Sequence, residues 1–186
     1  MTSHPLPIIE AKRLRLRCIE ESDVDQLYEI FSDPKVMRYW STPPLQTRED
    51  AMSLWQEIQE SNMKGTYLKW GVALRPSDKV IGTVTLFNLD QAQGRAEIGY
   101  AQAQAYWGNG YIHEALQALL SYAFNEMKMR RLEADVDPRN VGSIKTLERL
   151  GFQKEGLLRE RWHVAGEIQD AFFYGLLKHE WIRKQS

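Results

Sequence analysis

The sequence has little cysteine. Its 186 residues include one, Cys18, which excludes an internal disulfide and favours a reducing, cytoplasmic location. Alternation along residues 13–18 places this thiol inside a strand, so we expect it to be buried and inert and not to serve as a nucleophile. The histidines and the cysteine lack the spacing of metal ligands, which predicts no metal site. The histidines are His4, His113, His163 and His179.

Long apolar runs and a dominant charge are also missing. No stretch of about 18 apolar residues occurs, and residues 1–5 show neither a secretory leader nor a lipidation signal, so no membrane association is expected. The 24 basic and 25 acidic residues nearly cancel, which argues against binding nucleic acid through bulk charge. Internal repeats and linkers rich in Pro, Gly or Ser are absent, which predicts one domain over residues 1–186.

Large aromatic rings, by contrast, are abundant. The chain has six Trp and eight Tyr, and rings of this size cover much surface. We expect some of them to line a ligand site as well as to fill the core.

Hydrophobic periodicity predicts strands and helices in a definite order. A capping-box pattern at residues 22–25 precedes the first expected helix, and another at residues 47–50 begins the second. The predicted strands are 13–18, 70–74, 80–89, 96–100, 132–136, 152–164 and 168–177, and the predicted helices are 24–31, 47–64, 112–127 and 143–150. This order predicts an α+β domain that has an antiparallel meander first and one β-α-β unit in its second half.

A glycine-rich segment, residues 106–115, leaves a strand and opens the longest expected helix. Gly108 and Gly110 allow a tight turn that exposes backbone N–H groups beside the positive end of the helix, and such a turn suits a phosphate. His113 stands where a dinucleotide-binding loop needs a third glycine, and no Gly-Lys-Ser/Thr ends the segment as in a P-loop. The alternative is a plain glycine-rich turn that leads into a core helix.

Several motifs in order resemble the GNAT acetyltransferases, and among them the RimJ/RimL branch, which is named for enzymes that acetylate N-termini of ribosomal proteins. The resemblance runs from Arg13 to Trp181. It implies a single GNAT-like domain with a mixed, mostly antiparallel sheet that is splayed at its centre and carries helices on both faces. The motifs are residues 97–100, 106–111, 114–115, Asn140 with Ser143, and 150–152.

The resemblance also implies acetyl-CoA as co-substrate, with no metal. Gly108, Asn109 and Gly110, flanked by Trp107 and Tyr111, would bind its pyrophosphate. The backbone of Ile98, Gly99 and Tyr100 would pair with the pantetheine amides like an added strand. Asn140 and Ser143 would lie near the cofactor, although Asn140 could instead be only a helix cap and Ser143 only a first-turn residue.

The sequence departs from the superfamily pattern at two positions. Ala105 stands where a Gln or Arg usually precedes the loop. The RimJ/RimL branch often lacks that Gln or Arg. Leu147 stands where many members carry a tyrosine that protonates the departing thiolate. A thiol has a pKa of about 8.5, so thiolate can leave without a strong acid, and Ser143 or a water can supply a hydrogen bond. A backbone N–H of residues 98–100 can stabilise the oxyanion, and transfer is expected to go directly to the amine.

A general base is needed most for lysine-like amines, because their pKa of about 10.4 exceeds the 7.7 to 8.0 of an α-amino group. Asp135 is our first candidate and Glu97 the second, with Glu155 and Glu160 behind them. The alternative for each is a solvated carboxylate or an ion pair.

The family resemblance places the acceptor between the loop that joins the first two helices and the last two strands. Trp40 and Trp162 are the residues expected there, although Trp40 could simply anchor a helix to the sheet. We predict acetyl transfer to an amine, most simply a protein N-terminus. The alternatives are a small amine such as an antibiotic, polyamine or amino acid, and a CoA-binding module without activity. A homodimer is a further expectation.

Overall fold

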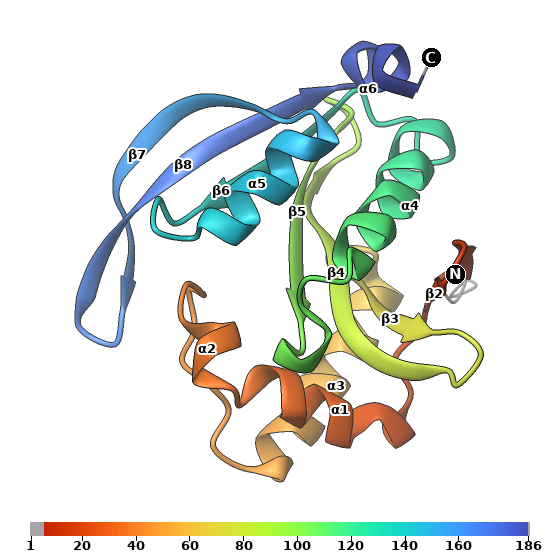
Figure 1. The fold of residues 1–186 in the computed structure, drawn as a ribbon, viewed down its shortest axis with the longest axis vertical. Coiled ribbons are helices and arrows are strands. Elements are labelled where there is room, and N and C mark those ends of the chain that lie inside the picture. The colour runs from red at the N-terminus through yellow and green to blue at the C-terminus, as the bar shows by residue number, and fades with distance from the viewer. Residues whose placement is uncertain (1–5, 186) are drawn as a thin grey trace.

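A computed structural model describes residues 6–185, so His4 and the start of the chain lie outside it. The strands form one open sheet in the order β1-β2-β3-β4-β5-β6-β8-β7 (Figure 1). They are β1 (Ile9–Glu10), β2 (Leu14–Arg17), β3 (Leu68–Leu74), β4 (Lys79–Asp90), β5 (Arg95–Gln102), β6 (Arg131–Val136), β7 (Gln153–Val164) and β8 (Glu167–Leu177).

Helices cover both faces of this sheet, as predicted. They are α1 (Val24–Phe31), α2 (Pro34–Met37), α3 (Arg48–Lys64), α4 (Tyr111–Asn125), α5 (Val141–Leu150) and α6 (Lys178–Gln185). Side chains of α4, α5 and α6 share one hydrophobic cluster with Trp70. Side chains of α1, α2 and α3 form a second cluster that includes Ala73 and Ala101 from the opposite face of the sheet. The amphipathic helices therefore divide between the two faces, because successive strand residues point to opposite sides.

The sheet is splayed between β5 and β6, the one parallel pair that the described strands form. Pairing joins Arg95 to Arg131 and ends where Glu97 meets Glu133. Beyond this point β5 continues to Gln102 and β6 to Val136 without pairing to each other. The splay confirms the expectation that rested on the family resemblance, and it leaves one backbone edge of β5 open.

Sequence patterns located most elements and missed several small ones. Thr47 and Asp50 form the expected capping box of α3. The box expected at residues 22–25 is instead made by Glu20 and Asp23 around a short 3₁₀ turn, Glu21–Asp23. The two-residue β1 and the carboxy-terminal α6 were not predicted, since they carry too little periodic pattern. Cys18 follows β2 instead of lying within it, and it is half-buried.

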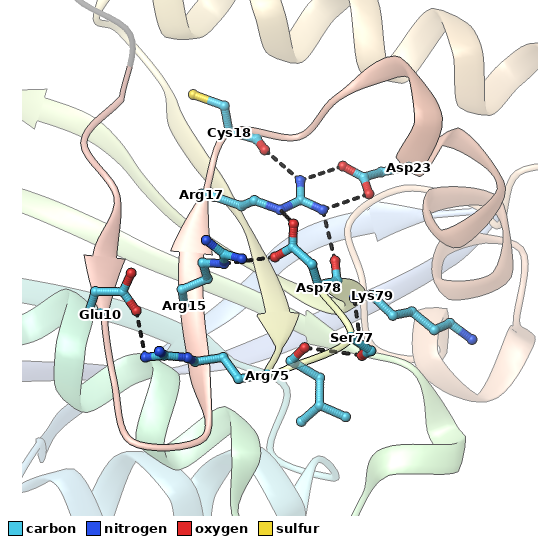
Figure 2. A network of polar contacts seen from close by, with 10 residues as sticks. Glu10, Arg15, Arg17, Cys18, Asp23, Arg75, Ser77, Asp78 and Lys79 are labelled. Atoms are coloured by element: carbon cyan, nitrogen blue, oxygen red, sulfur yellow. Dashed lines mark hydrogen bonds and ion pairs between the residues drawn. The ribbon is translucent and has the colours of Figure 1, made fainter.

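A buried arginine ties the start of the chain to the sheet (Figure 2). The Arg17 guanidinium donates to both carboxylate oxygens of Asp23 at 2.7 and 2.9 Å, and to the Asp78 carbonyl oxygen at 3.0 Å. Its Nε lies 3.1 Å from the Asp78 carboxylate. The hydrogen bond to Asp23 raises the pKa of Arg17 further above its ordinary value, so the cation is permanent. The network joins β2, the approach to α1 and the β3–β4 turn.

Candidate functional site

The glycine-rich loop has the backbone conformation that the sequence predicted. Gly108 and Gly110 adopt φ angles of +78° and +74°, in the left-handed region that side chains disfavour. Gly110 is the N-cap residue of α4, and no side chain caps that helix. The N–H groups of its first turn, which begins at Tyr111, therefore have no partner within the helix. They and the helix dipole form a site suited to an anion such as a diphosphate.

A residue that the sequence reasoning overlooked supports this loop. Arg13 donates from Nη1 to the Asn109 carbonyl oxygen at 3.0 Å, and its Nε is 2.7 Å from the Glu114 carboxylate. Its guanidinium also lies over the Tyr111 ring, 4.5 Å from the centroid. Arg13 is nearly a hundred positions away in the chain, so no local pattern could show this contact.

Side chains within the loop fix its shape. The Asn109 amide donates to the carbonyl oxygens of Tyr106 and Trp107, both at 3.1 Å. The Trp107 ring nitrogen donates to the Gln102 carbonyl oxygen at 2.8 Å, while 47% of the residue stays exposed. Asn109 therefore orders the turn through its side chain, and Trp107 presents an open ring face beside it.

The open edge of β5 leads toward this loop. It carries Ile98, Gly99 and Tyr100, immediately after the last pairing with β6. An extended backbone with unpaired N–H and C=O groups can accept a further strand-like ligand. The loop offers N–H donors for a diphosphate, and this edge offers backbone partners for amide groups, which are the parts that a CoA thioester would require. No atom lies within 4 Å of a Cβ placed at Gly108, so the space beside the loop is open.

Two hydroxyl groups meet across the splay. The Tyr100 hydroxyl lies 2.6 Å from the Ser143 Oγ, and the Ser143 backbone N–H donates to the Asn140 side chain at 3.1 Å. Asn140 therefore caps α5, which was one of the two roles expected for it. This cap holds Ser143 opposite Tyr100. Burial raises the pKa of Tyr100, so its phenol stays protonated and can donate a hydrogen bond at any neutral pH.

The carboxylates on β6 and β5 share one face of the sheet. Asp135 lies two residues beyond Glu133, and the parallel register gives Glu97 the same facing as Glu133. Asp135 has its carboxylate 3.4 Å from Arg161, whereas Glu97 accepts from the Asn88 amide at 2.8 Å. Both proposed bases thus already have a partner, and neither is a free carboxylate.

The comparison with protein families decides the identity of the fold. The profile described as "Acetyltransferase (GNAT) domain" matches residues 13–153. The chain belongs to the GNAT acetyltransferases. The protein is therefore an N-acetyltransferase, and its fold is one that uses acetyl-CoA.

Among three relatives of this GNAT chain, two bear names that point to different acceptors. The uncharacterized N-acetyltransferase p20 of Bacillus licheniformis is 39% identical over 91% of the chain and 96% of its own length. YdaF of Bacillus subtilis, which bears the provisional name ribosomal N-acetyltransferase, is 40% identical over 54% of the chain and 55% of its length. The spermidine N(1)-acetyltransferase of Escherichia coli K12 is 22% identical over 92% of the chain and 90% of its length.

Solved structures agree on the fold. A GNAT acetyltransferase from Bacillus anthracis superimposes with a TM-score of 0.83 at 29% identity, covering 93% of the chain and 99% of that protein. Mycobacterium smegmatis RimJ, solved in complex with CoA-disulfide, has a TM-score of 0.83 at 21% identity, covering 96% and 95%. Among the described residues, no helix has the length and apolarity to cross a membrane, and no cluster of His, Cys, Asp or Glu could hold a metal ion.

The expected acceptor residues of the GNAT domain lie on separate elements. Trp40 follows α2, is half-buried and packs edge-on against Phe31 at 5.4 Å between ring centroids. Trp40 therefore holds α1 against its neighbours in the second hydrophobic cluster, which agrees with the alternative that it anchors a helix to the sheet. Trp162 lies on the β7–β8 hairpin with its ring exposed and the Arg161 guanidinium 5.2 Å from it.

The sequence analysis did not identify one residue near Trp40, the lysine at position 69. Lys69 of β3 is 3% exposed, and its ammonium lies 5.0 Å from the Phe31 ring, 5.4 Å from Tyr67 and 6.0 Å from Trp40. A lone lysine at the start of an apolar strand gives no sequence signal that distinguishes it from a surface residue.

Proposed function

We propose that this enzyme transfers the acetyl group of acetyl-CoA directly to the α-amino group of a protein N-terminus. The observation that carries the proposal is the uncapped start of α4, with its two left-handed glycines, beside the open edge of β5. The RimJ-like fold and the name borne by YdaF favour a protein acceptor.

Each part of the site has a distinct task in this proposal. Bound acetyl-CoA supplies an activated acetyl group as a thioester. The N–H groups at Gly108 to Tyr111 hold the diphosphate, and the backbone of residues 98–100 aligns the thioester. A backbone N–H of that strand stabilises the negative charge that develops on the carbonyl oxygen.

The hydroxyl pair assists departure of the thiolate. Tyr100 can donate to the Ser143 Oγ, which leaves the serine proton free to point toward the sulfur. Asp135 is the proposed base for acceptors that reach the site as ammonium ions, with Glu97 as second choice. The proposed transfer goes directly to the amine, without a thiol intermediate. Cys18, which is half-buried, donates to the Leu6 carbonyl oxygen at 3.7 Å and has no role in it.

Two other functions predict different acceptor preferences. A small-amine acetyltransferase is suggested by the spermidine enzyme among the relatives, and a CoA-binding module without activity by Leu147 in place of tyrosine. Acetylation of peptides over small amines supports the first proposal, the reverse preference supports the second, and binding without acetylation supports the third.

The first experiment is thermal unfolding with and without acetyl-CoA. A ligand that binds only the folded state at a hundred times its Kd adds about 2.7 kcal/mol, so we expect a clear rise in Tm. Release of free CoA is then followed with a peptide library and with a panel of small amines. Absence of a Tm rise at saturating acetyl-CoA would contradict the proposed cofactor site.

A further inference from the structure

Lys69 carries a cation without a counter-ion at the end of a largely covered side chain. Its ammonium nitrogen keeps some contact with solvent. Its residue is 3% exposed, and within residues 6–185 no carboxylate pairs with its ammonium and no atom accepts a hydrogen bond from it. Three aromatic rings surround it, from Phe31, Trp40 and Tyr67. Aromatic faces attract an ammonium only modestly, and because solvent still reaches this one, a carboxylate can approach Lys69 and pair with its charge.

The position of Lys69 connects it to the open edge of β5. The antiparallel register places Lys69 beside Thr85, and Thr85 beside Gly99, so all three face the same side of the sheet. Two strand spacings, or about 10 Å, separate the backbones of Lys69 and Gly99. This face is the one that carries Glu97 and Asp135, opposite the face covered by α4 and α5.

A continuous aromatic surface fills the interval. The Tyr67 ring lies 5.4 Å from the Lys69 ammonium and 5.9 Å from the Phe87 ring. The Phe87 ring in turn is 3.4 Å from the position that a Cβ at Gly99 would occupy. A molecule whose amine approaches Gly99 along this surface therefore extends toward the cation.

We propose that Lys69 binds a carboxylate of the acceptor, so that the preferred substrates are amines that also carry a carboxylate. This inference rests on the proposed function, because it assigns the thioester to the edge at Gly99. The carboxylate belongs either to an acidic side chain near a peptide N-terminus or to a free amino acid. A polyamine has no such group, and its own cations are repelled by Lys69.

The test compares matched acceptors. One arm uses peptides that differ only in Glu or Gln at the second position, and the other uses a free amino acid and its amide. In at least one arm, the unaltered enzyme is expected to have a kcat/KM at least tenfold higher for the acceptor with the carboxylate than for its amide counterpart. The difference is expected to arise from a lower KM. Whichever arm shows the preference identifies the source of the carboxylate.

Variants then assign the preference to the cation. Lys69→Met is expected to reduce it below threefold and Lys69→Arg to retain most of it. Lys79→Met is the matched control, because Lys79 also lies over a ring, that of Tyr106, but pairs with Glu29. Should Lys69→Met fail to fold, Lys69→Gln provides a second neutral variant.

Two results would overturn the assignment: no preference in the unaltered enzyme in either arm, or a preference that survives removal of the charge. The Tm rise with acetyl-CoA is measured on the same samples. A normal rise without preference overturns the role of Lys69 alone, whereas no rise overturns the proposed function itself.

Discussion

At the scale of single residues, we propose that the contact between Ser143 and Tyr100 takes the role of the tyrosine that many family members carry at the position of Leu147. Leu147 is buried in the core, so this position cannot supply a proton donor. Ser143 lies one turn before Leu147 on α5, and its hydroxyl is 2.6 Å from that of Tyr100 on β5, so the pair can offer a neutral donor at the splay.

Ser143→Ala is expected to lower kcat less than tenfold. A thiol with a pKa of about 8.5 gives a leaving group that needs little protonation near neutrality, and Tyr100 remains in place. Steady-state rates at saturating acetyl-CoA provide the measurement. A thousandfold loss would show that the serine proton is essential and that the leaving-group argument is wrong.

Asp135→Asn is expected to slow acetylation of lysine-like amines about a hundredfold at pH 7, and of α-amino peptides only a few-fold. The difference arises because only the first class arrives almost entirely protonated. The rates with both acceptor classes are compared, with Asp137→Asn as control, since Asp137 is held by Arg139 at 2.6 Å. Equal losses in both classes would count against Asp135 as the base.

The raised pKa of Tyr100 predicts a stability effect at high pH. Because burial favours the protonated phenol in the folded state, stability is unaffected below the ordinary pKa of about 10 and falls as the pH rises above it. In Tyr100→Phe, the loss of unfolding free energy between pH 9 and pH 11 should be smaller by about 1 kcal/mol. Urea unfolding at pH 9 and pH 11 measures it, and an unchanged pH slope in the variant would refute the role of this phenol.

At the scale of elements, the turn from β5 into α4 is the proposed cofactor site, and its backbone provides the binding groups. Two glycines in the left-handed region bring the chain to an uncapped helix start, and Arg13, from the bend just before β2, contacts the turn. The proposed anion-binding groups are therefore backbone N–H groups, while the side chains of Asn109 and Arg13 hold the turn in shape.

Gly110→Pro is expected to abolish the Tm rise with acetyl-CoA. Proline removes an N–H and cannot adopt the φ of +74° found at this position. Gly65→Pro is the matched control, since Gly65 also has a left-handed φ, of +68°, but ends α3. The control should unfold at a lower temperature yet keep its response to acetyl-CoA. Retention of the response in folded Gly110→Pro would exclude the loop as the anion site.

At the scale of the whole molecule, the Arg17 network holds the amino-terminal elements against the sheet (Figure 2). It lies outside the residues proposed for binding, so its loss should affect stability without altering the affinity of the folded enzyme for acetyl-CoA. The expected homodimer stays a prediction that light scattering in solution can test.

Asp23→Ala is expected to lower the unfolding free energy by about 3 kcal/mol, because it leaves a buried guanidinium without its main partner. Asp25→Ala removes an exposed pair with Arg48 and should change it by less than about 1 kcal/mol. Chemical denaturation of both variants measures the difference. Similar small losses would mean that the network contributes little.

The sequence by itself determined the local features: the glycine turn, the capping box of α3, the long periodic helix α4 and the glycine end of α5. Each depends on residues close together in the chain, so propensity and spacing reveal them. The resemblance added the family, which the comparison confirmed.

Only the tertiary structure decided what long-range contacts control. It inserted β8 between β6 and β7, placed Arg13 on the loop, joined Tyr100 to Ser143, and enclosed Lys69 in aromatic rings. It also showed that the candidate base Asp135 is paired with Arg161. These contacts join residues distant in sequence, and the balance of packing and charge that brings them together leaves no local pattern in the chain.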